Sequence, residues 1–220
     1  MAVRRQLILQ STALVVVDMQ NAFVDQRNPS FVPVSREIVP NINRLASQLR
    51  DTGGTVVWVY TTFGDNTKTQ WSAFFGGVYS DAFIAAVIDQ LRDGSDGHHL
   101  WHELDINTDD LQFCKDRFSA FLPGHCELPN YLKQHGIDTV VIAGTVTNVC
   151  CESSARDALM QNYSVIMVSD ANAALTDDDH NASMTAIAQT FGDVMSSDEV
   201  IQRLQPAVRS EKSGNGRFNE

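Results

Sequence analysis

Short apolar segments alternate along the chain with segments that carry apolar residues at helical spacing. Four apolar segments are rich in β-branched residues: Ala13–Asp18, Thr55–Phe63, Thr139–Thr145 and Ser164–Asp170. Two shorter segments have the same character, Leu111–Lys115 and Asp193–Ser196. A continuous apolar run is typical of a strand that is buried on both faces of a parallel sheet.

The segments between these predicted strands favour amphipathic helices. Apolar residues share one helical face within residues 38–49, 83–91, 128–132 and 184–191. Glycines follow three of these segments, as they often follow helices, and Ser80 is a reasonable N-cap for the segment at 83–91. Strands that alternate with helices predict an α/β fold, a three-layer αβα sandwich with a mainly parallel, Rossmann-like sheet. Ligands of such folds gather at the carboxyl ends of the strands.

Length and composition favour one domain. The 220 residues contain no visible internal repeat, and 43% of them are hydrophobic, which is enough for a sizeable core. We expect a single domain over residues 1–204. Residues 205–220 are polar and contain Gly214 and Gly216, so we expect a flexible C-terminal tail there.

The charge balance excludes some classes of partner. Lys and Arg number 16 against 27 Asp and Glu, a formal net charge of −11. This argues against binding to nucleic acid and to anionic membrane surfaces, both of which require a basic face. No apolar run approaches the ~20 residues of a membrane span. Arg4–Arg5 and the apolar residues after them only faintly resemble a secretion signal, without a cleavage site, so we expect a cytoplasmic protein.

Four cysteines are too few for a disulfide scaffold at this length, so reduced thiols are expected. Cys150 and Cys151 follow a predicted turn at 144–148 and precede a helical segment. The amide groups and dipole of a helix N-terminus lower the pKa of a thiol and so favour the reactive thiolate. The alternative is that both cysteines are small buried apolar residues. Position alone leaves the two interpretations open.

Asp18 and Lys115 follow or end predicted strands and carry opposite charges. Taken singly, Asp18 could be an ordinary turn residue and Lys115 a solvated surface charge. Together with Cys150 they form a chemically complete set. A carboxylate can take the proton of a thiol, and a cation beside them stabilises the resulting anions.

Three segments that contain these residues resemble the signatures of the isochorismatase-like cysteine hydrolases, in that family's order: VVVDMQNAF at 15–23, KDRFSAF at 115–121 and GTVTNVC at 144–150. The resemblance covers most of residues 13–200. It implies a six-stranded parallel sheet with Asp18 as base, Lys115 as its cationic partner and Cys150 as nucleophile. It also implies a cis peptide bond at Thr145–Val146.

The backbone N–H groups of Val146 and Cys150 would then form the oxyanion hole. Many family members carry valine at the position of Cys151, so we assign Cys151 to core packing. The expected chemistry uses no metal and no cofactor. Homo-oligomers, dimers or tetramers, are frequent in the family and are expected here.

Two departures from the family narrow the expected activity. The nicotinamidase branch carries metal-binding histidines after its second strand, whereas residues 60–67 contain none. Isochorismatase proper cleaves an ether and lacks the nucleophilic cysteine. We therefore expect hydrolysis of a C–N bond in a small amide, carbamoyl or ureido compound through a thioester. The alternatives are hydrolysis of an ether bond, and a catalytically silent binding protein on the same fold.

Further residues near the motifs are weaker candidates. Phe23 and Phe121 lie close in sequence to Asp18 and Lys115 and could contact the substrate, as could Asn21 and Asn148. The apolar segment Trp71–Tyr79 could form a lid or a subunit contact. His98, His99 and His102 are closely spaced, but they lack the His-Glu-x-x-His order of zinc hydrolases, and nearby glycines favour a loop.

Overall fold

The structure is a computed structural model that describes residues 9–77 and 79–204. Its centre is one six-stranded sheet in the order β3-β2-β1-β4-β5-β6, in which every neighbouring pair is parallel. The strands are β1 (Thr12–Val17), β2 (Thr55–Thr61), β3 (Leu111–Lys115), β4 (Thr139–Thr145), β5 (Ser164–Ala173) and β6 (Asp193–Met195). The predicted fold class is confirmed. The predicted flexible tail at 205–220 lies outside the described residues.

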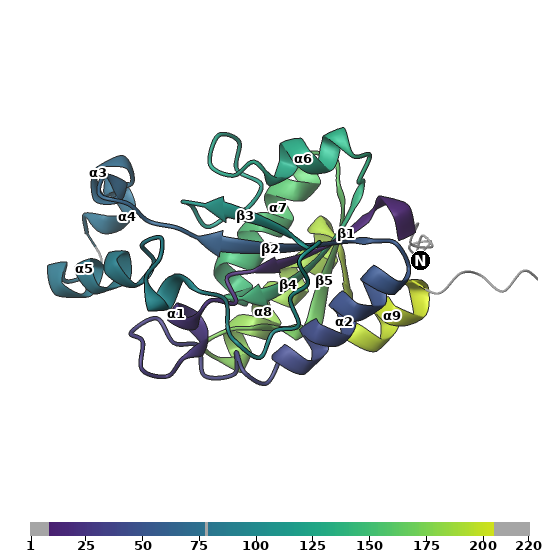
Figure 1. The fold of residues 1–220 in the computed structure, drawn as a ribbon, viewed down its shortest axis with the longest axis horizontal. Helices are drawn as coiled ribbons and strands as arrows, with labels where there is room; N and C mark the ends of the chain where they lie inside the picture. Colours follow the sequence, from purple (N-terminus) through teal and green to yellow (C-terminus); the bar gives the residue numbers. More distant parts are fainter. Residues whose placement is uncertain (1–8, 78, 205–220) are drawn as a thin grey trace, which may run out of the picture.

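Helices cover both faces of the sheet (Figure 1). On one face lie α2 (Val39–Asp51) and α9 (Ser197–Leu204), which bury side chains such as Leu45 and Val200. On the other lie α6 (Leu128–Gln134), α7 (Glu152–Met160) and the continuous helix formed by α8 (Asp177–Ala186) and η4 (Ile187–Phe191). Every residue of the central strands β1 and β4 is buried, which explains why these strands are apolar without alternation.

The structure places the start of α5 (Asp81–Gln90) as predicted and extends strand β5 beyond its predicted end. Ser80 caps α5 as predicted, because its side chain accepts a hydrogen bond from the N–H of Phe83. Strand β5 continues three residues beyond Asp170, and its register with β4 shifts between Ile142 and Gly144. The amide of Asn172 fills this irregularity by donating to the carbonyls of Ile142 and Val168.

Several short helices lie beyond the carboxyl ends of the strands. They are α1 (Asn21–Val24), α3 (Thr67–Gln70), α4 (Ser72–Phe75) and η2 (Asp96–His98), together with α5. Figure 1 shows α3, α4 and α5 at the left, projecting from the sheet, while η1 (Leu9–Ser11) leads into β1 from the opposite side. The projecting helices form a small core of their own around Phe63, Phe75 and Ile84. Within residues 9–77 and 79–204, no helix is both long and apolar enough to cross a bilayer.

Candidate active site

Adjacent strands bring three polar side chains to one edge of the sheet. Asp18 directly follows β1, Thr61 ends β2 and Lys115 ends β3. Because the three strands are parallel neighbours, their carboxyl ends meet. Asp18 has a φ of 53°, in the left-handed region that few residues other than glycine adopt, and strained backbone of this kind clusters at functional sites.

Asp18 and Lys115 form a buried ion pair. The Nζ of Lys115 lies 2.7 Å from the Oδ2 of Asp18, and both side chains are fully shielded from solvent. Burial by itself lowers the pKa of Lys115, but the negative charge of Asp18 and its hydrogen bond to the ammonium group outweigh this effect, so the net pKa is raised above its usual value. Lys115 therefore stays charged at neutral pH.

Thr61 connects the two charged groups, and sequence reasoning missed it. Its hydroxyl donates to the Oδ1 of Asp18 at 2.9 Å and accepts from the Nζ of Lys115 at 2.6 Å. Gln20 fixes Thr61 in turn: its side chain donates to the carbonyl of Thr61 and accepts from its N–H. The available signal was the position of Thr61 at the end of a buried strand, the same position that singled out Asp18 and Lys115.

Cys150 lies in the π-helical turn η3 (Thr147–Cys151) between β4 and α7. The peptide bond between Thr145 and Val146 is cis, as the resemblance implied. Gly144 lets β4 approach β1 closely here, because a Cβ at this position would lie 2.1 Å from the carbonyl oxygen of Val17. The hydroxyl of Thr145 donates to the carbonyl of Asp18, which ties the turn to the ion pair.

The thiol of Cys150 is electrostatically coupled to the ion pair. Burial raises its pKa, the charge of Lys115 lowers it, and the charge of Asp18 raises it again, so the net pKa is well above that of a free cysteine. The predicted lowering of the Cys150 pKa is therefore wrong, because desolvation exceeds the favourable effect of the cation. The resting residue is a neutral thiol that needs a base to become a nucleophile.

Backbone groups around Cys150 are suited to stabilising an oxyanion. Among the described residues, no hydrogen bond is donated by the N–H of Val146, the first residue after the cis bond. The hydroxyl of Ser154 donates to the carbonyl of Cys150 and accepts from the N–H of Ala120. These bonds fix the turn against the loop that follows Lys115.

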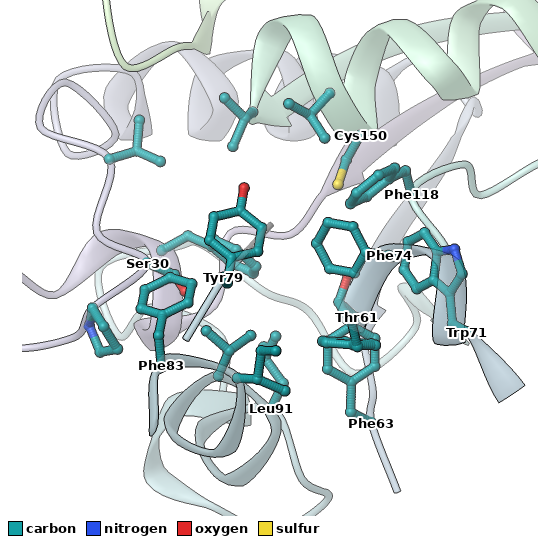
Figure 2. Close-up of a pocket in the computed structure, with 18 of the residues that line it drawn as sticks. Ser30, Thr61, Phe63, Trp71, Phe74, Tyr79, Phe83, Leu91, Phe118 and Cys150 are labelled. Carbon is teal, nitrogen blue, oxygen red and sulfur yellow. The ribbon is translucent and has the colours of Figure 1, made fainter. Parts of the chain in front are cut away.

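A pocket of about 550 Å³ opens from this site toward α3, α4 and α5 (Figure 2). Thr61, Val146 and Cys150 lie on its wall, as does Phe23, one of the predicted substrate contacts. Eight further lining residues are aromatic: Phe31, Phe63, Trp71, Phe74, Phe75, Tyr79, Phe83 and Phe118. The Trp71–Tyr79 segment, predicted to be a lid or a subunit contact, thus supplies pocket wall.

Three other predicted substrate contacts lie outside the lining of this pocket. Phe121 is fully buried in the core, with its ring against Tyr163. The amide of Asn21 donates to the carbonyl of Asp96, and Asn148 is exposed on η3. Proximity to the motifs in sequence therefore does not bring Phe121, Asn21 or Asn148 to the pocket.

Cys151 and His98 have roles in packing. Cys151 is fully buried in the core beside α7, in agreement with the predicted packing role. His98 is buried, stacks on Tyr60 and bonds the hydroxyl of Thr62 through Nε2, whereas His102 is exposed. The described residues contain no group of three or more His, Cys, Asp or Glu side chains that could hold a metal ion.

The Isochorismatase domain family matches residues 12–199. The chain therefore belongs to the isochorismatase-like hydrolase superfamily. Two curated proteins illustrate its range. A "Probable inactive nicotinamidase" of Arabidopsis thaliana is 34% identical over 177 residues, 80% of this chain and 87% of that protein. The ureidoacrylate amidohydrolase RutB of Klebsiella pneumoniae is 28% identical over 212 residues, 90% of this chain and 89% of that protein.

Solved structures agree with this membership. A cysteine hydrolase from Pseudomonas syringae has a TM-score of 0.81 and 28% identity, covering 91% of this chain and 95% of that one. N-carbamoylsarcosine amidase from Thermoplasma acidophilum has a TM-score of 0.69 and 27% identity, covering 86% of this chain and 97% of that one. A cysteine hydrolase and an amidase are thus among the solved structures that this chain resembles.

Proposed function

We propose that this protein hydrolyses a C–N bond of a small amide, carbamoyl or ureido compound, with Cys150 as nucleophile. The observation that carries the proposal is the buried Asp18–Lys115 pair, at 2.7 Å, coupled to a thiol that lines a pocket. The amidohydrolases among the relatives of this chain support the same reaction class.

The first half of the reaction forms a thioester. Asp18 takes the proton of the Cys150 thiol as the sulfur attacks the carbonyl carbon, so that an S–C bond forms and the carbonyl becomes an oxyanion. The N–H groups of Val146 and Cys150 stabilise this oxyanion, and each such donor typically contributes about 2.7–4 kcal/mol. Collapse of the oxyanion breaks the C–N bond, and Asp18 protonates the leaving nitrogen.

The second half regenerates the thiol. Asp18 takes a proton from water, the resulting hydroxide attacks the thioester carbon, and the S–C bond breaks. The sulfur recovers its proton from Asp18, and the acid product leaves. Lys115 holds the Asp18 carboxylate in position through its 2.7 Å contact, while Thr61 orients both groups.

A screen of small amides, carbamoyl compounds and ureides, with ammonia or amine release as the readout, tests the proposal. We expect Cys150→Ser to lower kcat/KM by at least about 10³-fold, as loss of a nucleophile does in other hydrolases. Cys114→Ser is the matched control, because Cys114 is exposed and lies outside the pocket, and it should turn over substrate normally. Parental turnover by Cys150→Ser, or loss of activity with a chelator, would contradict the mechanism.

Ligand binding without turnover is a second candidate, favoured by the Arabidopsis relative, whose name includes the word inactive. Intact-protein mass spectrometry separates the two functions. A hydrolase shows a transient acyl or carbamoyl adduct on Cys150, whereas a silent binding protein shows ligand binding in calorimetry with neither adduct nor product. The homo-oligomer expected from the resemblance stays a prediction, which sedimentation velocity can test.

A further inference from the structure

We propose that the substrate is a neutral amide or ureide that carries an aromatic or bulky branched apolar group, bound against Trp71, Phe74 and Phe118. The inference rests on the proposed function, since it names the substrate class of the same site. Three features of the pocket lead to this proposal: the packing of the three rings, the apolar far wall, and the interactions that already engage the guanidinium of Arg117.

The three rings pack on one another beside the thiol. The centroids of Trp71 and Phe74 are 4.6 Å apart in a stacked arrangement, and Phe118 meets them edge-on at 4.7 Å and 5.1 Å. Figure 2 shows the ring of Phe118 next to the Cys150 sulfur, with Phe74 beside it. A substituent on the reacting carbonyl group or on its nitrogen would therefore contact the aromatic rings directly beside the thiol.

The far wall of the pocket is equally apolar. Phe83, Ile84 and Val87 of α5 line it, together with Leu91 and Phe63. A volume of about 550 Å³ exceeds the needs of urea or a simple amide and falls within the range of small-molecule sites. Such a cavity gains affinity by burying apolar surface, at roughly 25 cal/mol per Å².

The charge of the wall disfavours anionic substrates. Arg117 is the one charged side chain among the described lining residues. Its guanidinium donates to the carbonyls of Asp116 and Gln70, lies 3.4 Å from the Asp116 carboxylate and covers the Trp71 ring at 4.9 Å. Because these partners engage the cation, a substrate carboxylate would lose its hydration without gaining an unpaired positive charge.

Affinity labelling of the thiol tests the substrate class without requiring turnover. Three reagents are compared at pH 8: chloroacetamide, N-benzylchloroacetamide and the anionic N-chloroacetylglycine. In each case the Cys150 sulfur displaces chloride, an S–C bond replaces the C–Cl bond, and the thiol proton passes to Asp18. The rate constant for modification of Cys150 is measured by peptide mass spectrometry.

We expect the benzyl reagent to label Cys150 at least about tenfold faster than chloroacetamide, and the anionic reagent to label it more slowly. Exposed Cys114 is an internal control in every sample, and it should show no preference for the benzyl group. Equal rates for all three reagents at Cys150, or a preference for the anionic one, would overturn the proposal.

Variants of Phe74 test whether the aromatic rings cause the preference of Cys150 for the benzyl reagent. Phe74→Leu and Phe74→Ala should reduce the benzyl preference at Cys150 stepwise, while Phe113→Ala should retain it. Phe113 is a matched control, because its ring packs on Tyr131 outside the pocket. If both Phe74 variants keep the full preference while folding normally, as judged by near-UV circular dichroism, the rings do not bind the substituent and the proposal is wrong.

The outcome is distinguishable from failure of the proposed function. Selective labelling by the benzyl reagent with no amide turned over would support the substrate class and refute the hydrolase. Cys150-dependent turnover restricted to small polar or anionic ureides, with no benzyl preference, would support the hydrolase and refute the substrate class.

Discussion

Strand β3 has an ion pair at each end, partly buried at the amino end and fully buried at the carboxyl end, and the two pairs differ in how many hydrogen bonds their carboxylates accept. Asp110 directly precedes the strand and pairs with Arg50, whereas Lys115 ends it and pairs with Asp18. Both carboxylates are largely shielded from solvent, with side-chain exposures of 4% for Asp110 and 0% for Asp18. Burial alone therefore does not distinguish a structural pair from a chemical one.

The Asp110 carboxylate, at the amino end of β3, accepts hydrogen bonds from several groups. Arg50 donates to both oxygens of Asp110, and Trp58 and the N–H of Asn107 donate to Oδ2 as well. Burial by itself raises the pKa of Asp110, but these hydrogen bonds outweigh it and hold the pKa below its usual value. Oδ2 of Asp110 thus accepts three hydrogen bonds and Oδ1 one, which leaves this carboxylate less capacity for a reacting proton than Asp18 has.

The Asp18 carboxylate, at the carboxyl end of β3, accepts fewer hydrogen bonds and lies near the Cys150 thiol. Each oxygen of Asp18 accepts one side-chain hydrogen bond, from Thr61 or from Lys115. A carboxylate can accept about four, so Asp18 retains lone pairs for the proton of Cys150. The comparison indicates that a buried carboxylate can act as a base when it accepts few hydrogen bonds and lies beside a nucleophile.

The largest effect is expected from Lys115→Met, which removes the cation at a similar side-chain length. We expect kcat to fall by about 10³-fold, because the Asp18 carboxylate would lose the hydrogen bond that positions it and the developing thiolate would lose its stabilising cation. The same assay on Arg50→Met should give nearly parental kcat for the folded fraction. Equal losses in both variants would remove the functional distinction between the two ion pairs.

The reverse pattern is expected for stability. Asp110→Asn should lower the free energy of unfolding by about 3 kcal/mol, because Arg50 would be left without its buried partner, while kcat stays unchanged. Urea denaturation measures the change. Asp105→Asn is the matched control: Asp105 also pairs with Arg50 but is 56% exposed, so its loss should cost less than about 1 kcal/mol.

A smaller effect is expected from Thr61→Val, which keeps the shape of the side chain and removes the hydroxyl. Two hydrogen bonds in the site are lost, and we expect kcat to fall by about tenfold. Thr62→Val is the control, since the hydroxyl of Thr62 bonds His98 outside the ion pair. A kcat for Thr61→Val equal to that of Thr62→Val would show that the hydroxyl does not orient Asp18 or Lys115.

The smallest effect concerns pH. The pKa of Asp110 is lower in the folded protein than in the unfolded chain, so its stabilisation is fully present above the unfolded pKa of about 4. That stabilisation is lost as the pH falls through the folded pKa. The difference in unfolding free energy between the parent and Asp110→Asn should therefore shrink between pH 6 and pH 3. A difference that does not change with pH would contradict the linkage.

Local pattern was enough to predict the strands, the positions of Asp18 and Lys115 at strand ends, and the position of Cys150 in the turn between a strand and a helix. Continuous β-branched runs indicate buried parallel strands, and the carboxyl ends of such strands converge on one edge. The prediction missed Thr61, because an uncharged threonine in a β-branched strand stands out only by its position, and the predicted strand extended past Thr61 to Phe63. It also misjudged the direction of the Cys150 pKa, because desolvation depends on neighbours from several distant segments.

The sequence by itself determined the alternation of strands and helices and the chemical types available at the strand ends, because both depend on residues close together in the chain. Only the tertiary structure decided which aromatic residues line the pocket and which belong to the core. Phe118 and Phe121 are three positions apart, yet one lies beside Cys150 and the other packs on Tyr163. Side-chain direction after a strand end depends on packing against residues far away in the chain, such as Phe74 for Phe118 and Tyr163 for Phe121, which a local pattern does not contain.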